Sequence, residues 1–177
     1  SKISSNKIGV MLKGITPEFD KGLTNYALID ASNAYKINKH DDVIFFNLDS
    51  SKGGLRASNS SQWMQFIKDL EYRQETNFVI LLPTPVFGTD GFSDKLEADL
   101  FHEKLIEAEK KGKNIFVVQG GSETKSELID GIRYIQLYTK DLTKPEDIYN
   151  ISVVEFVANG SDISYEISKV FPQPKVK

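Results

Sequence analysis

Three short, continuously apolar runs limit what this chain can fold into more than any other feature of its sequence. They occupy residues 42–48 (DVIFFNL), 78–82 (FVILL) and 114–118 (NIFVV), and they consist mainly of β-branched and aromatic residues. A run of this length without polar alternation is typical of a β-strand that is buried on both faces. Strands of that kind occur in parallel sheets covered by helices, so we predict an α/β fold whose core strands are parallel neighbours.

The segment after the first run has the spacing of a helix that covers such a sheet. Within residues 59–75, apolar residues recur at i, i+3, i+4 and i+7 from Trp63 onward. Ser58 or Asn59 is expected to cap the first turn, because short polar side chains accept hydrogen bonds from free backbone N–H groups there. We therefore expect the Trp63 face of this helix to pack against the sheet.

A second, longer helix is predicted between the second and third runs. Ser93 is its expected cap, Lys110 and Lys111 give it a positive last turn, and Gly112 is its expected stop. Five residues are expected on or near its apolar face: Leu96, Leu100, Leu105, Ile106 and Ala108.

The C-terminal third has a different pattern from the centre. Residues 131–138, 149–158 and 161–169 alternate between apolar and polar side chains, and Asn159-Gly160 is a strong hairpin signal. We expect this part to be antiparallel and to complete a sheet. The fold class is therefore α/β, with parallel core strands, flanking helices and a C-terminal antiparallel hairpin.

The N-terminal part gives weaker signals. Residues 7–13 predict a strand and residues 14–22 predict a loop, whereas residues 25–37 do not favour one kind of element. At 177 residues and 40% hydrophobic, the chain fits one domain, and we expect it to be a fragment of a larger multidomain protein. In this interpretation residues 1–41 form an atypical N-terminal part and residues 170–177 a polar tail.

Composition excludes several classes of function. A net charge of −3 gives no basic footprint for nucleic acid, and no apolar stretch is long enough for a membrane span. Because the chain has no Cys, it has no disulfide, thiolate metal site or cysteine nucleophile. A sequence without Cys is also common among exported bacterial proteins, so we expect an extracellular or cell-surface location, although no signal peptide is visible.

Three stretches of the sequence resemble the calcineurin-like metallophosphoesterases. They are VIFFNLDSSKGGLRASNSSQW, FVILLPTPVFGTDGFSDKLEADLF and GKNIFVVQGGSETKSELIDGIRYIQL, and the likeness in order and spacing covers about residues 42–168. The resemblance implies half or more of an α/β/β/α sandwich, and specifically its C-terminal half. It also implies hydrolysis of phosphate esters by a pair of divalent ions, such as Mn, Zn or Fe.

The positions that bind metal in this family are occupied here by other residues. Pro83 stands where the resemblance places the histidine of a His-x-Pro turn, and Gly121 and Glu123 stand at the two histidines of Gly-His-x-His. Residues 1–41 contain none of the earlier ligand motifs. Glu123 alone cannot hold two ions. We therefore expect no metal or other cofactor.

The resulting functional prediction is a pseudoenzyme. We expect a phosphoesterase-like domain that has lost two-metal catalysis and serves as a structural or binding module of a larger secreted or cell-surface bacterial protein. Its expected partners are neighbouring domains of the same polypeptide, with a cell-wall or carbohydrate ligand left open. The alternative is an active metal-dependent phosphoester or phosphodiester hydrolase whose remaining ligands lie outside these 177 residues.

No catalytic, cofactor-binding or metal-binding residue is assigned, but a pocket is expected where the predicted parallel strands end. We expect Gly120 and Gly121 to be required for backbone geometry, for instance a positive φ. The candidate pocket residues are Asp49, Ser50, Ser51, Arg56, Pro83, Gly120, Gly121, Ser122 and Glu123.

Other motifs have both a structural and a functional interpretation. Gly53-Gly54, with Lys52 and Arg56, is either a structural turn or an anion-binding nest. His40, before two aspartates, is a surface turn or part of a small metal site, and His102 is expected to be solvated or to flank its helix. The segment 90–94 (DGFSD) lacks the oxygen pattern of an EF-hand calcium loop.

Overall fold

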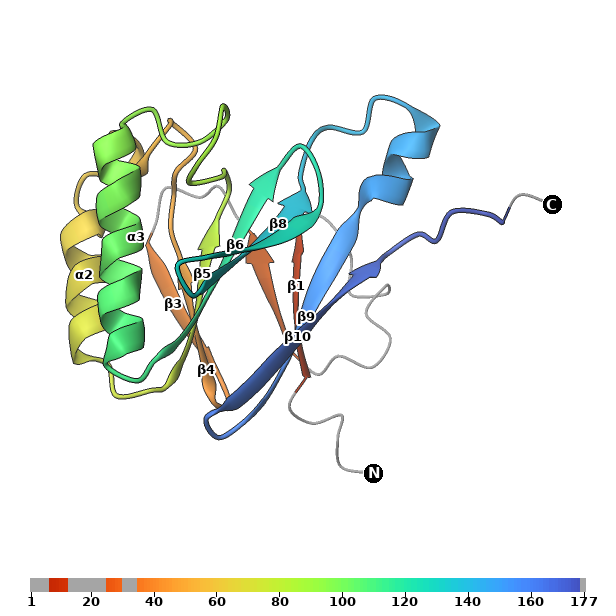
Figure 1. Cartoon of the computed structure of the whole chain (residues 1–177). Coiled ribbons are helices and arrows are strands. Elements are labelled where there is room, and N and C mark those ends of the chain that lie inside the picture. Colours follow the sequence, from red (N-terminus) through yellow and green to blue (C-terminus); the bar gives the residue numbers. More distant parts are fainter. Residues whose placement is uncertain (1–6, 13–24, 30–34, 176–177) are drawn as a thin grey trace.

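The computed structural model describes residues 7–12, 25–29 and 35–175, which form two β-sheets and a layer of helices (Figure 1). The strands are β1 (Lys7–Leu12), β2 (Asn25–Ile29), β3 (Lys36–His40), β4 (Val43–Asn47), β5 (Asn77–Leu82), β6 (Asn114–Gly121), β7 (Lys125–Ile129), β8 (Ile132–Tyr138), β9 (Ser152–Asn159) and β10 (Asp162–Lys169). The helices are α1 (Leu55–Ser58), α2 (Gln62–Tyr72) and α3 (Lys95–Lys110), with a 3-10 helix, η3 (Pro145–Asn150). The predicted loop 14–22 lies outside the described residues.

The described strands form one sheet in the order β3-β4-β5-β6-β8-β7 and another in the order β10-β9-β1-β2. In the first sheet β4, β5 and β6 are parallel neighbours, which confirms the central prediction. β4 is joined to β5 through α1 and α2, and β5 is joined to β6 through α3. Figure 1 shows α2 and α3 together on one face of the sheet. The fold is therefore mixed α/β with flanking helices.

Two apolar cores account for the absence of polar alternation in the central strands. Along β4, Ile44 and Phe46 belong to the core shared with α2 and α3, whereas Val43 and Phe45 belong to the core between the two sheets. All residues of β4 and β5 are buried. Burial on both faces is the reason that these runs are apolar throughout. Trp63 lies in the helix-side core, as predicted.

The C-terminal third is only partly antiparallel, which corrects one prediction. β9 and β10 form the expected hairpin, but its two-residue loop is Gly160-Ser161, one residue later than the predicted Asn159-Gly160, and Gly160 has a positive φ. However, β8 pairs in parallel with β6, because β7 intervenes in the chain and pairs antiparallel with the outer side of β8. The pattern of β7 was missed because it is an edge strand with four exposed residues out of five.

The segment 25–37, which the sequence left ambiguous, contains β2 and the first two residues of β3, and these strands belong to different sheets. β2 pairs in parallel with β1, whereas β3 pairs antiparallel with β4. Parallel and antiparallel neighbours are thus separated by only a few residues of sequence. The pairing partner decides this outcome, and local composition does not reveal it.

The N-termini of α2 and α3 differ from the predictions. Asp94, and not Ser93, caps α3 by accepting the N–H groups of Leu96 and Glu97. α2 begins at Gln62 without a side-chain cap, while the Oδ1 atom of Asn59 accepts the Ser61 N–H group just before the helix. The predicted stop of α3 is confirmed, since Gly112 has a positive φ.

One apolar residue predicted on the buried face of α3 is exposed. Leu96 lies in the first turn and is 79% exposed, while Leu105 and Ala108 are buried as expected. The polar residues Glu97 and His102 are buried on this helix instead. Glu97 contacts the start of α1, and His102 contacts β8 and the turn before it, so polar contacts determine part of the buried face.

Candidate functional site

The candidate site is built where β4, β5, β6 and β8 end, and we call this side of the sheet the carboxyl edge. Because these strands are parallel, the loops that follow them meet there. The Ser50 and Thr84 hydroxyls lie 2.6 Å apart across two of these loops. A Cβ atom added at Gly120 would lie 2.6 Å from the Pro83 carbonyl oxygen. The structure therefore brings together the predicted residues from the three central strands.

Asp49 is the most buried charged member of this group, with no solvent exposure. Gln62 of α2 holds its backbone on both sides: Gln62 Oε1 accepts the Asp49 N–H group at 2.9 Å, and Gln62 Nε2 donates to the Asp49 carbonyl at 2.7 Å. The Asp49 Oδ1 atom accepts the Ser51 N–H group. Asp49 is therefore rigidly positioned at the carboxyl edge.

Gly120 and Gly121 do not form the turn that the sequence suggested. They are the last residues of β6, and neither has a positive φ. At Gly120 an added Cβ atom would lie 2.6 Å from the Pro83 carbonyl oxygen, which belongs to the backbone, so close packing and not backbone strain explains this glycine. At Gly121 an added Cβ atom would lie 2.4 Å from the Gln136 amide, so this side chain would have to move.

Amide side chains fill the space beside these glycines. Gln119 Oε1 accepts the Val86 N–H group at 3.1 Å, and Gln136 Nε2 donates to the Glu123 carbonyl at 3.0 Å. The Glu123 side chain itself is 67% exposed and lies 3.7 Å from the Lys125 amine. Ser122, next to it, is also exposed. Ser122 and Glu123, the last two residues of the predicted pocket, therefore lie in an exposed bend and not in a pocket.

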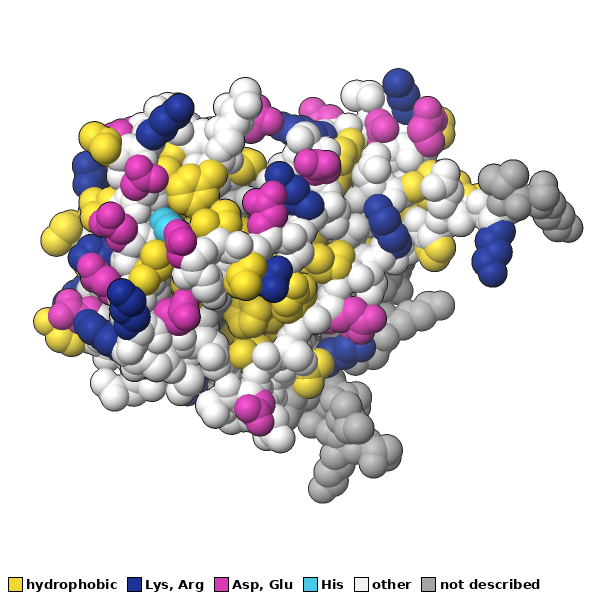
Figure 2. Space-filling view, in the orientation of Figure 1, with side chains coloured by type: hydrophobic (Ala, Val, Ile, Leu, Met, Phe, Trp, Pro, Cys, Tyr) yellow, Lys and Arg dark blue, Asp and Glu magenta, His cyan; other side chains and the backbone are white. Residues whose placement is uncertain are grey.

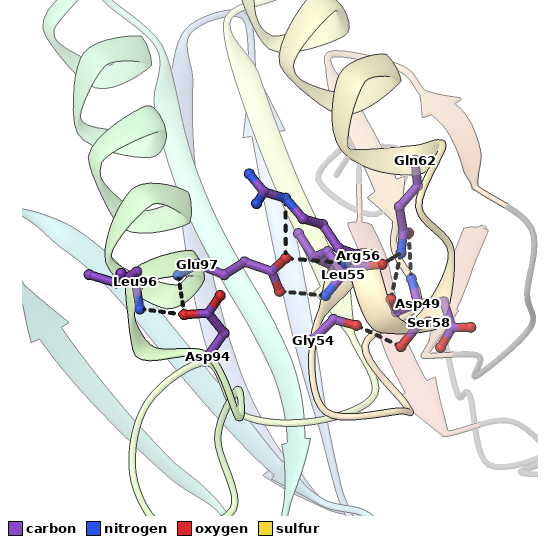
Figure 3. A network of polar contacts seen from close by, with 9 residues as sticks. All are labelled: Asp49, Gly54, Leu55, Arg56, Ser58, Gln62, Asp94, Leu96 and Glu97. Atoms are coloured by element: carbon purple, nitrogen blue, oxygen red, sulfur yellow. Dashed lines mark hydrogen bonds and ion pairs between the residues drawn. The ribbon is translucent and has the colours of Figure 1, made fainter.

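The group beside Gly53-Gly54 is a carboxylate of the protein itself, that of Glu97. Glu97 Oε1 accepts the Leu55 N–H group at 2.8 Å, and Oε2 accepts the Arg56 N–H group at 3.2 Å (Figure 3). Arg56 Nε lies 3.7 Å from the same carboxylate, and its guanidinium stands over the Trp63 ring. The proposed nest is therefore occupied by Glu97, and Arg56 points toward α3.

His102 is buried and not solvated, which corrects the prediction from its position in the helix. Its Nδ1 atom lies 2.8 Å from the Tyr134 hydroxyl, and its Nε2 atom lies 2.8 Å from Asp130 Oδ2. Asp130 and Gly131 form the tight turn between β7 and β8, and both have positive φ. These contacts attach that turn to α3. The sequence could not show them, because the partners are 28 and 32 residues away.

Burial, and then the charge of Asp130, raise the pKa of Tyr134 far above its usual value of 10.0. The unfolded chain therefore loses this proton near pH 10 while the folded chain keeps it, so stability should fall as the pH rises above 10. In Tyr134→Phe, we expect the free energy of unfolding to fall less steeply above pH 10, by about 1.4 kcal/mol per pH unit.

Urea unfolding of both proteins at pH 7 and at several values above pH 10 measures this difference. The pH 7 values separate the lost hydrogen bond to His102 from the ionisation effect. Equal alkaline slopes in the two proteins would contradict the assignment to Tyr134.

His40 and the nearby Asp42, which the sequence suggested as part of a small metal site, make contacts that stabilise the fold. His40 ends β3 and packs against the Phe45 ring, with the ring centres 5.6 Å apart. Asp42 Oδ2 accepts the Gly160 N–H group, which connects the β9–β10 hairpin to the six-stranded sheet. Within the described part of the chain, no three His, Cys, Asp or Glu side chains are grouped so that they could hold a metal ion.

The surface shows a mixture of charges. On the face in Figure 2, Lys and Arg side chains are interspersed with Asp and Glu, and hydrophobic side chains gather between β8 and β10. Phe116 of β6 and Ile163 and Tyr165 of β10 are partly buried against the core between the sheets. None of the helices in the described residues has the length and apolar character to cross a membrane.

No family model matches the sequence, and no curated protein matches it either.

Proposed function

We infer that this chain is a phosphoesterase-like domain that has lost two-metal catalysis and serves as a binding or structural module of a larger secreted or cell-surface protein. The observation that carries this proposal is the chemistry of the carboxyl edge. Pro83 and Gly121 supply no ligand atom from their side chains, and Ser50, Thr84, Gln119 and Gln136 hydrogen-bond within the protein.

The arrangement of the elements supports the resemblance from which the proposal starts. The parallel strands β4, β5 and β6 follow one another as the family pattern requires, a second sheet covers one face, and α2 and α3 cover the other. The fold alone does not indicate chemistry, because one fold supports many functions. The side chains at the carboxyl edge therefore decide between a catalytic and a binding role.

A two-metal site requires a dense set of oxygen and imidazole ligands around ions a few ångström apart. At the carboxyl edge the described carboxylates do not form such a set. Glu97 accepts two backbone N–H groups and Glu123 is mostly exposed, so Asp49 is the remaining buried carboxylate among these three. The imidazole of His102 is engaged on both nitrogens by Tyr134 and Asp130. These contacts favour binding or scaffolding over hydrolysis.

Calorimetric titration with Mn²⁺ and Zn²⁺ tests the loss of catalysis. We expect only the weak association that exposed carboxylates give, and we expect the same curve for Glu123→Ala. Tight binding of two ions per chain would overturn the proposal. It would support the alternative hydrolase, and phosphatase activity that Glu123→Ala abolishes in a longer chain would do the same.

A further inference from the structure

The strand β10 is a long edge strand of the four-stranded sheet. Among the described residues it pairs on one side only, antiparallel with β9. All eight of its residues are in continuous register with β9, and the strand contains no proline or bulge to interrupt pairing. The backbone N–H and C=O groups on the outer side of such a strand are able to pair with a further strand. β10 is therefore a candidate docking edge.

The six-stranded sheet extends further than β10 on this side of the protein. On β7, Leu128 lies opposite Arg133 of β8 and Ser126 lies opposite Ile135, which belongs to the core between the sheets. Residues directly opposite each other in a sheet share a face, so Leu128 also faces the four-stranded sheet. Leu128 is nevertheless 60% exposed. Since the Ser126 hydroxyl lies 2.9 Å from that of Tyr165, β10 borders β7 without covering it.

An open hollow of about 200 Å³ shows that there is room between the two sheets beside β10. Phe116 and Arg133 border it from the six-stranded sheet, and Ile163 borders it from β10. Phe116 and Ile163 are only partly buried, and Figure 2 shows hydrophobic side chains gathered between β8 and β10. A strand added to β10 would cover this surface, so its side chains on the side of the six-stranded sheet are expected to be apolar.

The charges on the other face of β10 select the remaining side chains of such a strand. Asp162 and Glu166 are exposed there, because they alternate with the residues that face the core. Glu166 lies directly opposite Glu155 of β9, and like charges at this spacing repel. Lys7 of β1 forms an ion pair with Glu155 at 2.7 Å, whereas no described cation forms one with Glu166. A basic side chain next to Glu166 would relieve this repulsion.

We propose that β10 binds an extended segment of a partner protein in which apolar residues alternate with lysine or arginine. The segment adds a strand to the sheet: its backbone pairs with β10, its apolar side chains cover Leu128 and the hollow, and its basic side chains lie next to Glu166. A second copy of β10 fits less well, because pairing would bring two acidic rows together. This inference goes beyond the proposed function, because it does not depend on the loss of catalysis at the carboxyl edge.

Fluorescence anisotropy with a labelled Lys-Val-Lys-Val-Lys-Val-Lys peptide tests the binding of a strand. Three matched probes are a permuted peptide in which the lysines precede the valines, a peptide with every backbone nitrogen methylated, and a peptide with glutamate in place of lysine. We expect saturable binding of the alternating basic peptide and none of the three others. Hydrogen exchange of the β10 backbone amides should become slower when this peptide is bound.

Charge and apolar variants test where the peptide lies. Glu166→Lys should weaken binding of the basic peptide by about tenfold and allow the acidic peptide to bind, because it reverses the sign of a cross-strand pair. The new lysine lies opposite Glu155, so the fold is retained. Leu128→Ala should weaken binding by about fivefold through lost apolar contact. Glu103→Lys and Leu96→Ala, the same changes at exposed positions of α3, should leave binding unchanged.

Four results would overturn the proposal. They are failure of the alternating basic peptide to bind, equal binding of the permuted or methylated peptide, equal effects of Glu166→Lys and Glu103→Lys, and equal effects of Leu128→Ala and Leu96→Ala. A dimer of the chain alone in sedimentation, with slow hydrogen exchange along β10, would assign the edge to a second copy instead. None of these results changes the metal titration, so the proposed function is tested separately.

Discussion

Replacing Glu97 with alanine should lower the free energy of unfolding by about 2–4 kcal/mol. The Glu97 carboxylate is buried and accepts the backbone N–H groups of Leu55 and Arg56. Removing it leaves the buried Leu55 N–H group without an acceptor, and this desolvation is the main part of the loss. The ion pair with Arg56 adds little, because the Arg56 side chain is 56% exposed and its distance is 3.7 Å.

Urea unfolding curves give this difference, and two variants control for other causes. Glu103→Ala removes an exposed carboxylate from the same helix and should change the free energy by no more than about 0.5 kcal/mol. Glu97→Gln keeps one acceptor oxygen, so its loss should lie between the other two. A loss for Glu97→Ala as small as that for Glu103→Ala would show that α1 does not depend on this contact.

Substitution of Gly120 by valine should be equally damaging, with a loss of about 3 kcal/mol or more. The first added atom would lie 2.6 Å from the Pro83 carbonyl oxygen and 2.7 Å from Thr139 Oγ1. Since the carbonyl belongs to the backbone at the end of β5, the clash can be relieved only by moving two adjacent strands apart. Gly120→Ala should already cost about 2 kcal/mol, because the contact involves the Cβ atom itself.

Two control substitutions, measured by the same unfolding experiment, separate close packing from backbone strain and from the loss of an exposed side chain. Gly88 has a φ of +93 and no atom within 4 Å of an added Cβ, so Gly88→Ala should show backbone strain alone, about 1 kcal/mol. Glu123→Ala, at the exposed bend after β6, should stay within about 0.5 kcal/mol. If Gly120→Ala is no worse than Gly88→Ala, close packing at the carboxyl edge is not the reason for this glycine.

The candidate pocket was predicted only in part. Ser50 contacts Thr84, and Gly120 lies against Pro83, as expected for parallel strands that end at one edge of a sheet. Arg56 does not face them, and its partner Glu97 was not predicted as a site residue. A buried glutamate in the first turn of a helix looks in sequence like an ordinary solvated residue, and only its distance from Leu55 in space reveals its role.

The sequence by itself determined the elements that depend on burial of continuous or alternating apolar surface. The runs that became β4, β5 and β6, the face of α2 that contains Trp63, and the β9–β10 hairpin were all predicted from local patterns. Local patterns suffice there because apolar burial and turn geometry act between residues close in sequence or repeat with the period of the element.

Only the tertiary structure decided the contacts made by single polar groups and by edge strands. The parallel pairing of β8 with β6, the hydrogen bonds of His102 to Tyr134 and Asp130, and those of Glu97 to the start of α1 each join residues that are far apart in the chain. A hydrogen bond or an edge pairing requires one partner at one distance, and it leaves no repeating pattern in the sequence. These interactions exist only after the sheets and helices have packed.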